Sequence, residues 1–428
     1  MRFPKMNPIL LLLHLFRHLR YRPKDDLCGC LRSGGILSFS FMALTPLCSE
    51  QFIHAQHSSD TMHAQIESMD VVAISRIVGG TRTDTDIEFE LLNIIRGQDL
   101  LQESQKVRVP YFGHYPLDET QFLLMGTRQP ELIWSSPQPL SEKAIAYLDA
   151  VLHLPTDPSK RLEFYLEYLE HEEKFLARDA FAEFATASYE QWVKLKPKLD
   201  REKLIEWINA ADISTSRKKN LYFVLLGICG IAEDRKLIET MMRNDDPKEQ
   251  SRLSAMIICY VSICGDDGLD VIDELVTGDK NCDFHRLYSF LNALRFLGGS
   301  TGIVREERVV QSLRLILRHP KSIDLVDKVI WELMRRTDWS HLDCLVELFK
   351  SVDKDHQFVR MPIFFYLQAC PEPRAEKMIH ELKEIDPGAH TLFLRVFGVP
   401  EPQKPRGYSN SWDLRRMVSP GYMGDLYD

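Results

Sequence analysis

Hydrophobic positions recur at helical spacing over most of the chain, from about residue 185 onward. An apolar helix, a turn of small residues and a second amphipathic helix repeat every 33 to 38 residues. The turns that follow the first helices lie at 226–230, 262–265, 297–299, 335–337 and 369–371. Each helix pair leaves an apolar face open until a neighbouring pair stacks on it. The pattern therefore predicts an α-helical repeat solenoid over residues 141–399.

Helix start signals support the same boundaries. Asp-Pro pairs lie at 157–158, 246–247 and 386–387, where Asp can accept free amide hydrogens and Pro needs no donor. Ser188 with Gln191, and Asp246 with Glu249, have the spacing of a capping box. We expect helices to begin at these positions.

The pattern upstream of the helices is that of β-strands. Five short apolar or alternating segments lie at 71–78, 88–91, 107–111, 120–125 and 131–134. We expect a small five-stranded antiparallel β-barrel over residues 64–136 and a Pro-rich hinge at 137–140. The predicted fold class is α+β multidomain, with the barrel followed by the all-α solenoid.

The N-terminal residues resemble a targeting segment. Apolar runs at 9–13 and 36–47 flank a basic stretch, and the second run has the length of a secretory signal core. We expect residues 1–55 to be a signal peptide or leader, residues 56–63 a linker, and the protein to be exported to the periplasm or the extracellular space. A buried N-terminal helix, an uncleaved anchor or a lipoprotein signal at Cys48 are the alternatives.

The net charge of the chain bears on the kind of partner that it could bind. Removing residues 1–55 would change the formal net charge from −9 to −13, because seven basic and three acidic residues are lost. An acidic chain argues against a nucleic-acid partner, which usually requires a basic face. We expect the basic run 217–219 to be the solvated start of a helix, and we expect no integral membrane span in the mature chain.

The spacing of the cysteines does not indicate a metal site or a redox site. The six cysteines after residue 55 form no Cys-x-x-Cys pair, so a zinc site or redox motif has little support. We expect most of them to be small buried hydrophobes. A disulfide between Cys229 and Cys264, which are one repeat apart, is left open.

The β segment carries a resemblance to a known family. The runs 70–72, 77–78, 89–97 and 122–125 are similar to the netrin-like or tissue-inhibitor-of-metalloproteinase type of OB barrel. The cysteine with which those inhibitors chelate a protease metal has no counterpart at 56–70, so protease inhibition is not implied. The helical part resembles HEAT-like repeats in its period and capping. The combination resembles bacterial exported proteins of unassigned function.

Several motifs that could suggest catalysis have structural explanations. The Gly-rich stretch 298–302 lacks the lysine of a phosphate-binding loop and falls at a repeat turn. His57 and His63 have no third metal ligand at a defined spacing, and the acidic cluster around His171 divides between helix faces. We therefore predict no catalytic, cofactor-binding or metal-binding residues and no cofactor.

The remaining functional surface is the face that stacked repeats expose to a partner. Trp331, Trp339 and Tyr366 are the candidate partner-binding residues, because Trp and Tyr supply much of the energy of protein interfaces. We expect a non-catalytic, exported scaffold of the cell envelope that binds another protein, of unknown identity, and a flexible tail at 400–428. The alternative is an enzyme or metal-binding protein with a site between barrel and solenoid that uses His114, Glu167 and His171.

Overall fold

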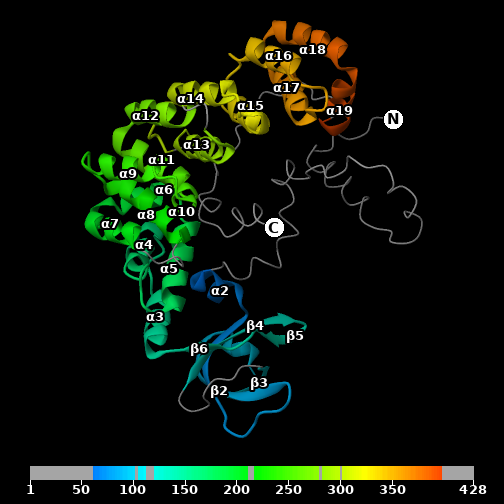
Figure 1. Ribbon diagram of the computed structural model, residues 1–428. Helices are drawn as coiled ribbons and strands as arrows, with labels where there is room; N and C mark the ends of the chain where they lie inside the picture. Colours follow the sequence, from blue (N-terminus) through cyan, green and yellow to red (C-terminus); the bar gives the residue numbers. More distant parts are fainter. Residues whose placement is uncertain are drawn as a thin grey trace, which may run out of the picture. The chain divides into compact units, whose positions relative to one another are not determined.

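The computed structural model describes residues 61–101, 105–111, 120–210, 216–278, 282–298 and 301–397 (Figure 1). The predicted leader at 1–55 and the predicted tail at 400–428 lie outside these residues, as do His57 and His114.

Five antiparallel strands build a nearly closed barrel in the order β3-β2-β1-β4-β5. Their bounds are β1 Val71–Ile77, β2 Asp86–Arg96, β3 Lys106–Pro110, β4 Gln121–Gln129 and β5 Glu131–Trp134. Each contains or overlaps one of the five predicted segments. The prediction of a five-stranded antiparallel β domain followed by helices is thus confirmed.

The central strands β1 and β4 are buried on both faces. Ala73, Phe122 and Leu124 belong to the small apolar core inside the sheet, whereas Val72 and Leu123 belong to the core that continues into the helices. A strand covered on both sides requires apolar residues at successive positions, as the run from Val71 to Ile74 shows. Two register shifts between β1 and β2 bend the sheet, as β-bulges do.

The segment expected to be a hinge contains a sixth strand. β6 (Gln138–Leu140) pairs with β4, and Leu140 is buried in the same core as the helices. Pro139 lies within this short strand, which is paired with β4 alone among the described strands, and proline is tolerated at such an edge. A helix that the sequence did not predict, α2 (Met62–Ser68), precedes β1 and is capped by Thr61.

Helices form the rest of the described chain. The helices before the regular repeats are α3 Glu142–Leu152, α4 Pro158–Leu166, α5 Lys174–Thr186, α6 Tyr189–Lys194 and α7 Arg201–Asn209. Those that follow are α8 Ser216–Cys229, α9 Asp234–Met242, α10 Pro247–Gln250, α11 Leu253–Cys264, α12 Asp266–Thr277, α13 Phe284–Leu297, α14 Glu306–Arg318, α15 Val326–Arg335, α16 Leu342–Ser351, α17 Gln357–Ala369, α18 Pro373–Ile385 and α19 Pro387–Phe397.

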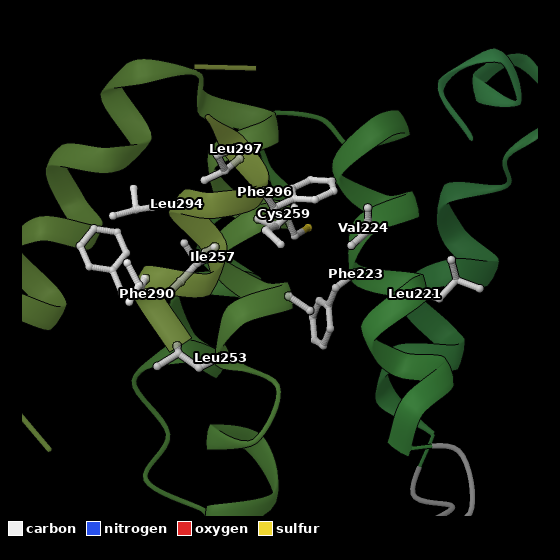
Figure 2. Close-up of a cluster of buried hydrophobic side chains, with 14 of the residues drawn as sticks. Leu221, Phe223, Val224, Leu253, Ile257, Cys259, Phe290, Leu294, Phe296 and Leu297 are labelled. Carbon is white, nitrogen blue, oxygen red and sulfur yellow. The ribbon is translucent and has the colours of Figure 1, made fainter. Parts of the chain in front are cut away.

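The repeating turns of the sequence mark the ends of the first helices. Helices α8, α11, α13, α15 and α17 end at residues 229, 264, 297, 335 and 369, and the predicted second helices are α9, α12, α14, α16 and α18. First helices pack on one another, α8 on α11, α11 on α13, α15 on α17 and α17 on α19. Figure 2 shows this packing in side chains from α8, α11 and α13, including Phe223, Ile257 and Phe290.

The cap signals are largely confirmed. Asp157 and Asp246 cap α4 and α10, and Ser188 with Gln191 forms a capping box at α6. At Asp246 the side chain accepts a hydrogen bond from Lys248 N at 2.8 Å, whereas Glu249 accepts from Arg252 Nη1 at 3.0 Å.

The expectation that 217–219 is a solvated helix start is wrong for its lysines. Lys219 is buried and donates to Ala210 O, and Lys218 donates to Leu169 O at 2.6 Å. The lysine ammonium groups satisfy free carbonyl groups of preceding segments, which accounts for a basic run in a packed position.

Candidate functional site

Helix α15, the first helix of one of the last repeats, carries an exposed tryptophan, Trp331. In α15, Val326, Val329, Ile330 and Leu333 are buried, which leaves Lys328 and Trp331, three residues apart, on the more exposed side. Trp331 is 42% exposed, although Trp is usually largely buried. An exposed indole among packed helices is a candidate interaction group.

The neighbouring helix extends this apolar surface. In α17, Phe358, Met361 and Phe365 are half-buried and lie on one stripe, since they are three and seven residues apart. The Trp331 ring centroid lies 4.8 Å from that of Phe365. We call the surface made by Trp331, Phe358, Met361 and Phe365 the aromatic face.

A buried carboxylate supports the aromatic face. Glu332, next to Trp331, is 1% exposed and accepts hydrogen bonds from Arg295 Nε at 2.9 Å and Arg335 Nη2 at 2.7 Å, and from Arg336. Burial opposes ionisation, yet the three guanidinium groups outweigh it and lower the pKa of Glu332. The network joins α13 to α15 at the residue next to exposed Trp331.

A shallow groove of about 560 Å³ borders this network. Its lining comes from the end of α13, the exposed side of α14 and the turn after α15: Gly298, Glu306, Glu307, Val310, Gln311, Arg314, Arg335, Arg336, Thr337 and Asp338. Thr337 ends α15 with a φ of 53°, in the left-handed region that usually selects glycine at this position. The formal charges of the lining side chains cancel.

A serine, a histidine and an aspartate meet beside this groove. Ser340 Oγ donates to Asp338 Oδ1 at 2.8 Å and lies 3.1 Å from His341 Nδ1. His341 Nε2 accepts from Arg314 Nε at 2.9 Å, and burial together with Arg314 lowers the pKa of the imidazole. A hydrolase needs a free histidine nitrogen that receives the serine proton. Here the serine proton is directed to Asp338, and the arrangement ties α14 to the turn after α15.

The three predicted partner-binding residues occupy different environments. Trp331 is exposed, Trp339 is partly buried, and Tyr366 is fully buried. The Tyr366 hydroxyl donates to Asp338 O at 2.7 Å, and its ring lies 5.1 Å from that of Trp339. These contacts make Trp339 and Tyr366 part of the packing between α17 and the turn after α15. Phe365, the ring partner of Trp331, lies on the aromatic face although it was not among the predicted residues.

The acidic cluster near His171 is divided among separate partners. Glu170 pairs with Lys218 and Tyr222, Glu172 with Lys143, and Glu173 accepts from Ser141 Oγ at 2.6 Å. His63, in α2, lies 3.5 Å from Glu67. Within the described ranges, no three His, Cys, Asp or Glu residues are grouped so that they could hold a metal ion.

The junction between β-sheet and helices contains a buried acidic pair that sequence reasoning missed. Asp179 accepts from Met62 N and from Tyr147 Oη, both at 2.6 Å. Glu183, one turn later on α5, is 4% exposed and pairs with Arg161 at 3.3 Å. Burial raises the pKa of Asp179, and the nearby Glu183 raises it further. The sequence signal was two acids four residues apart within an apolar helix.

The cysteines of the described chain are free thiols. Cys229 and Cys264 are both partly buried, and burial raises the pKa of Cys229 to about 11. A thiol with a raised pKa is a weak nucleophile at neutral pH. These residues therefore act in packing in this structure.

Comparison with known proteins gives no family for this chain. Searches against family models, curated proteins and solved structures found no match. Among the residues that the structure describes, none of the helices combines the length and the apolar character needed to cross a bilayer.

Proposed function

We propose that this chain is a non-catalytic, exported scaffold that binds another protein of the cell envelope through the aromatic face. The observation that carries the proposal is Trp331, whose indole is 42% exposed while its helix is held by the ion pairs of Glu332. Exposed tryptophans on rigid elements are frequent energetic centres of interfaces, because a large side chain is buried at little entropic cost.

Supporting chemistry comes from the neighbours of Trp331. Phe358, Met361 and Phe365 are only half-buried, so the aromatic face leaves apolar area on several adjacent side chains accessible to water. Clustered exposed apolar side chains on a folded protein are typical of interaction sites. Lys328 beside Trp331 supplies a charged rim, which is the usual surrounding of such a centre.

The proposal includes a family resemblance for each of the two parts of the chain. We infer that the helical part is HEAT-like, on the 33 to 38 residue spacing of its first helices, and that the β domain is netrin-like, on the strand motifs quoted above. Export rests on the composition of residues 1–55. Sequencing the N-terminus of the protein recovered from its host tests export: a start near residue 56 is expected, and an intact Met1 in the cytoplasm contradicts it.

The binding proposal is tested with matched variants of the full chain. Wild type, Trp331→Ala and Ile133→Ala are immobilised and exposed to envelope extract, and retained proteins are quantified by mass spectrometry. Ile133 is the control because it is 58% exposed and lies on β5, away from the aromatic face in the chain. We expect a protein retained by wild type and Ile133→Ala to fall about tenfold with Trp331→Ala, the effect of losing an interface centre. Equal retention by all three variants would reject the proposal.

A further inference from the structure

Helices α15, α17 and α19 each carry an aromatic ring at the same height along the helix. Trp331, Phe365 and Phe393 each lie four residues before the end of their helix, in α15, α17 and α19. Phe365 joins the other two, with ring centroids 4.8 Å from Trp331 and 6.5 Å from Phe393. The chain therefore leaves α19, at Phe397, about one helical turn from the level of the aromatic face.

The length of chain after α19 fits the span of this face. Residues 398–428 follow the last described helix, and Trp412 is 15 residues beyond Phe397. Packed helix axes are about 8–10 Å apart, so crossing from α19 over α17 to α15 requires about 16–20 Å. Residues 398–412 include three prolines, and a Pro-rich chain extends by up to about 3.1 Å per residue, so 15 residues can span up to about 46 Å. Intramolecular binding requires that the connecting chain can span the two sites, and this length is sufficient.

The composition of that segment complements the face. Residues 408–428 contain the aromatic residues Tyr408, Trp412, Tyr422 and Tyr427, but few branched aliphatic residues. Such a segment has too little apolar surface to build a core of its own, whereas its rings can pack on rings that are already held in place. The accessible rings of Trp331 and Phe365 offer that support.

We propose that residues 408–428 of this chain, anchored by Trp412, bind its own aromatic face and compete there with the protein partner. This inference rests on the proposed function, because it assigns a regulator to the same surface. A short tether gives an effective concentration of the order of 1 mM. A segment that binds as a free peptide with a Kd of about 100 µM would then occupy the face in about nine molecules of ten.

Photo-crosslinking of the full chain tests this placement. Trp412 is replaced by p-benzoylphenylalanine, the dilute protein is illuminated, and crosslinked peptides are identified by mass spectrometry. We expect crosslinks within one molecule to peptides from α15 or α17. Adding Trp331→Ala should lower their yield about tenfold, whereas Ile133→Ala should leave it unchanged. Crosslinks that are absent, scattered or directed to a second molecule would overturn the proposal.

Partner retention separates this inference from the proposed function. In the full chain, Trp412→Ala should increase retention of the Trp331-dependent partner, because its competitor is weakened. If the intramolecular crosslink forms but no protein depends on Trp331, the proposed function fails and the docking of residues 408–428 stands. If a partner depends on Trp331 but Trp412→Ala leaves its retention unchanged and the crosslink is missing, the docking fails and the proposed function stands.

Discussion

Trp331 and Phe365 hold their rings 4.8 Å apart at an interplanar angle of 46°, across the contact between α15 and α17. Trp331 nonetheless keeps 42% of its surface exposed, whereas Phe364, the residue before its partner, is fully buried. Adjacent aromatic residues on α17 thus have opposite environments. One faces the interior of the repeats and the other supports the exposed indole.

This difference predicts losses of stability of different size. Phe364→Ala should lower the free energy of unfolding by about 3–5 kcal/mol, because it leaves a cavity among packed helices. Trp331→Ala should cost about 1 kcal/mol, since much of the indole is already in water. Denaturant unfolding followed by circular dichroism measures both. A Trp331→Ala variant as unstable as Phe364→Ala would show that the indole is a structural residue.

The arginine network around Glu332 predicts a second outcome. Glu332→Gln removes the carboxylate that three guanidinium groups share, so we expect a loss of about 3–5 kcal/mol at pH 7. The pKa of Glu332 is lowered below 4.5, so its stabilisation is present above that pH and is lost as the pH falls through the folded-state pKa.

The pH dependence of stability shows whether the loss in Glu332→Gln arises from the missing charge. Thermal unfolding of wild type and Glu332→Gln between pH 7 and pH 3 should converge below about pH 4.5. Parallel curves over the whole range would mean that the loss arises from altered packing. Exposed Glu347, which pairs with Lys350 on the surface, provides a matched variant, Glu347→Gln, for which we expect a change below about 1 kcal/mol.

For Asp179, near the junction of β-sheet and helices, we predict that stability changes with pH in the direction opposite to that for Glu332. Its pKa is raised from 3.8 because burial penalises the charged form, so the unfolding free energy should fall as the pH rises from about 3.8 through the folded-state pKa. Asp179→Asn cannot ionise and can still accept from Met62 N. Its stability relative to wild type should therefore increase over this pH range.

Asp179→Ala distinguishes charge from hydrogen bonding at the same position. Loss of both carboxylate oxygens leaves Met62 N and Tyr147 Oη without their acceptor, which should cost about 1–3 kcal/mol for each buried group left unpaired. Chemical unfolding at pH 5 compares the two variants. Equal destabilisation by Asn and Ala would contradict the assigned hydrogen bonds.

Close contact between the first helices predicts sensitivity at Gly227. A Cβ atom there would lie 3.0 Å from Ser262 Cβ and 3.2 Å from Cys259 Cα, on the facing helix α11. Gly227→Val should force α8 and α11 apart and cost about 1–3 kcal/mol or more. Gly79→Val is the control, because a Cβ at Gly79 meets nothing within 4 Å. Similar unfolding midpoints for the two variants would contradict the tight packing of these helices.

The helical repeats and the strands could be predicted because their signals are local. The spacing of the turn after Cys229 and its counterparts follows directly from helix length, and the alternation Ile87, Phe89, Leu91 marks one buried face of β2. Short elements were missed where context decides. Pro139 indicated a hinge, yet Leu140 is buried in the core and the segment pairs with β4 as strand β6.

The candidate site could be predicted only in part. Sequence pattern selected Trp331 but could not separate it from Tyr366, because exposure depends on which side of each helix the neighbouring repeat covers. The burial of charged residues was not predicted either, although Asp179 and Glu183 stand four residues apart within an apolar helix. Glu332 and Asp179 look like ordinary surface acids until the structure brings Arg295, or the amide of Met62, from distant elements to meet them.

The central claim is that the surface around Trp331 meets another protein. The most direct measurement replaces Trp331 by p-benzoylphenylalanine in the full chain, expressed in the host that produces it, and illuminates intact cells. The account predicts an adduct of higher mass that contains a second protein and does not form when the photo-reactive residue replaces Ile133 on β5. Adducts of the same proteins at both positions, or no intermolecular adduct at position 331, would contradict it.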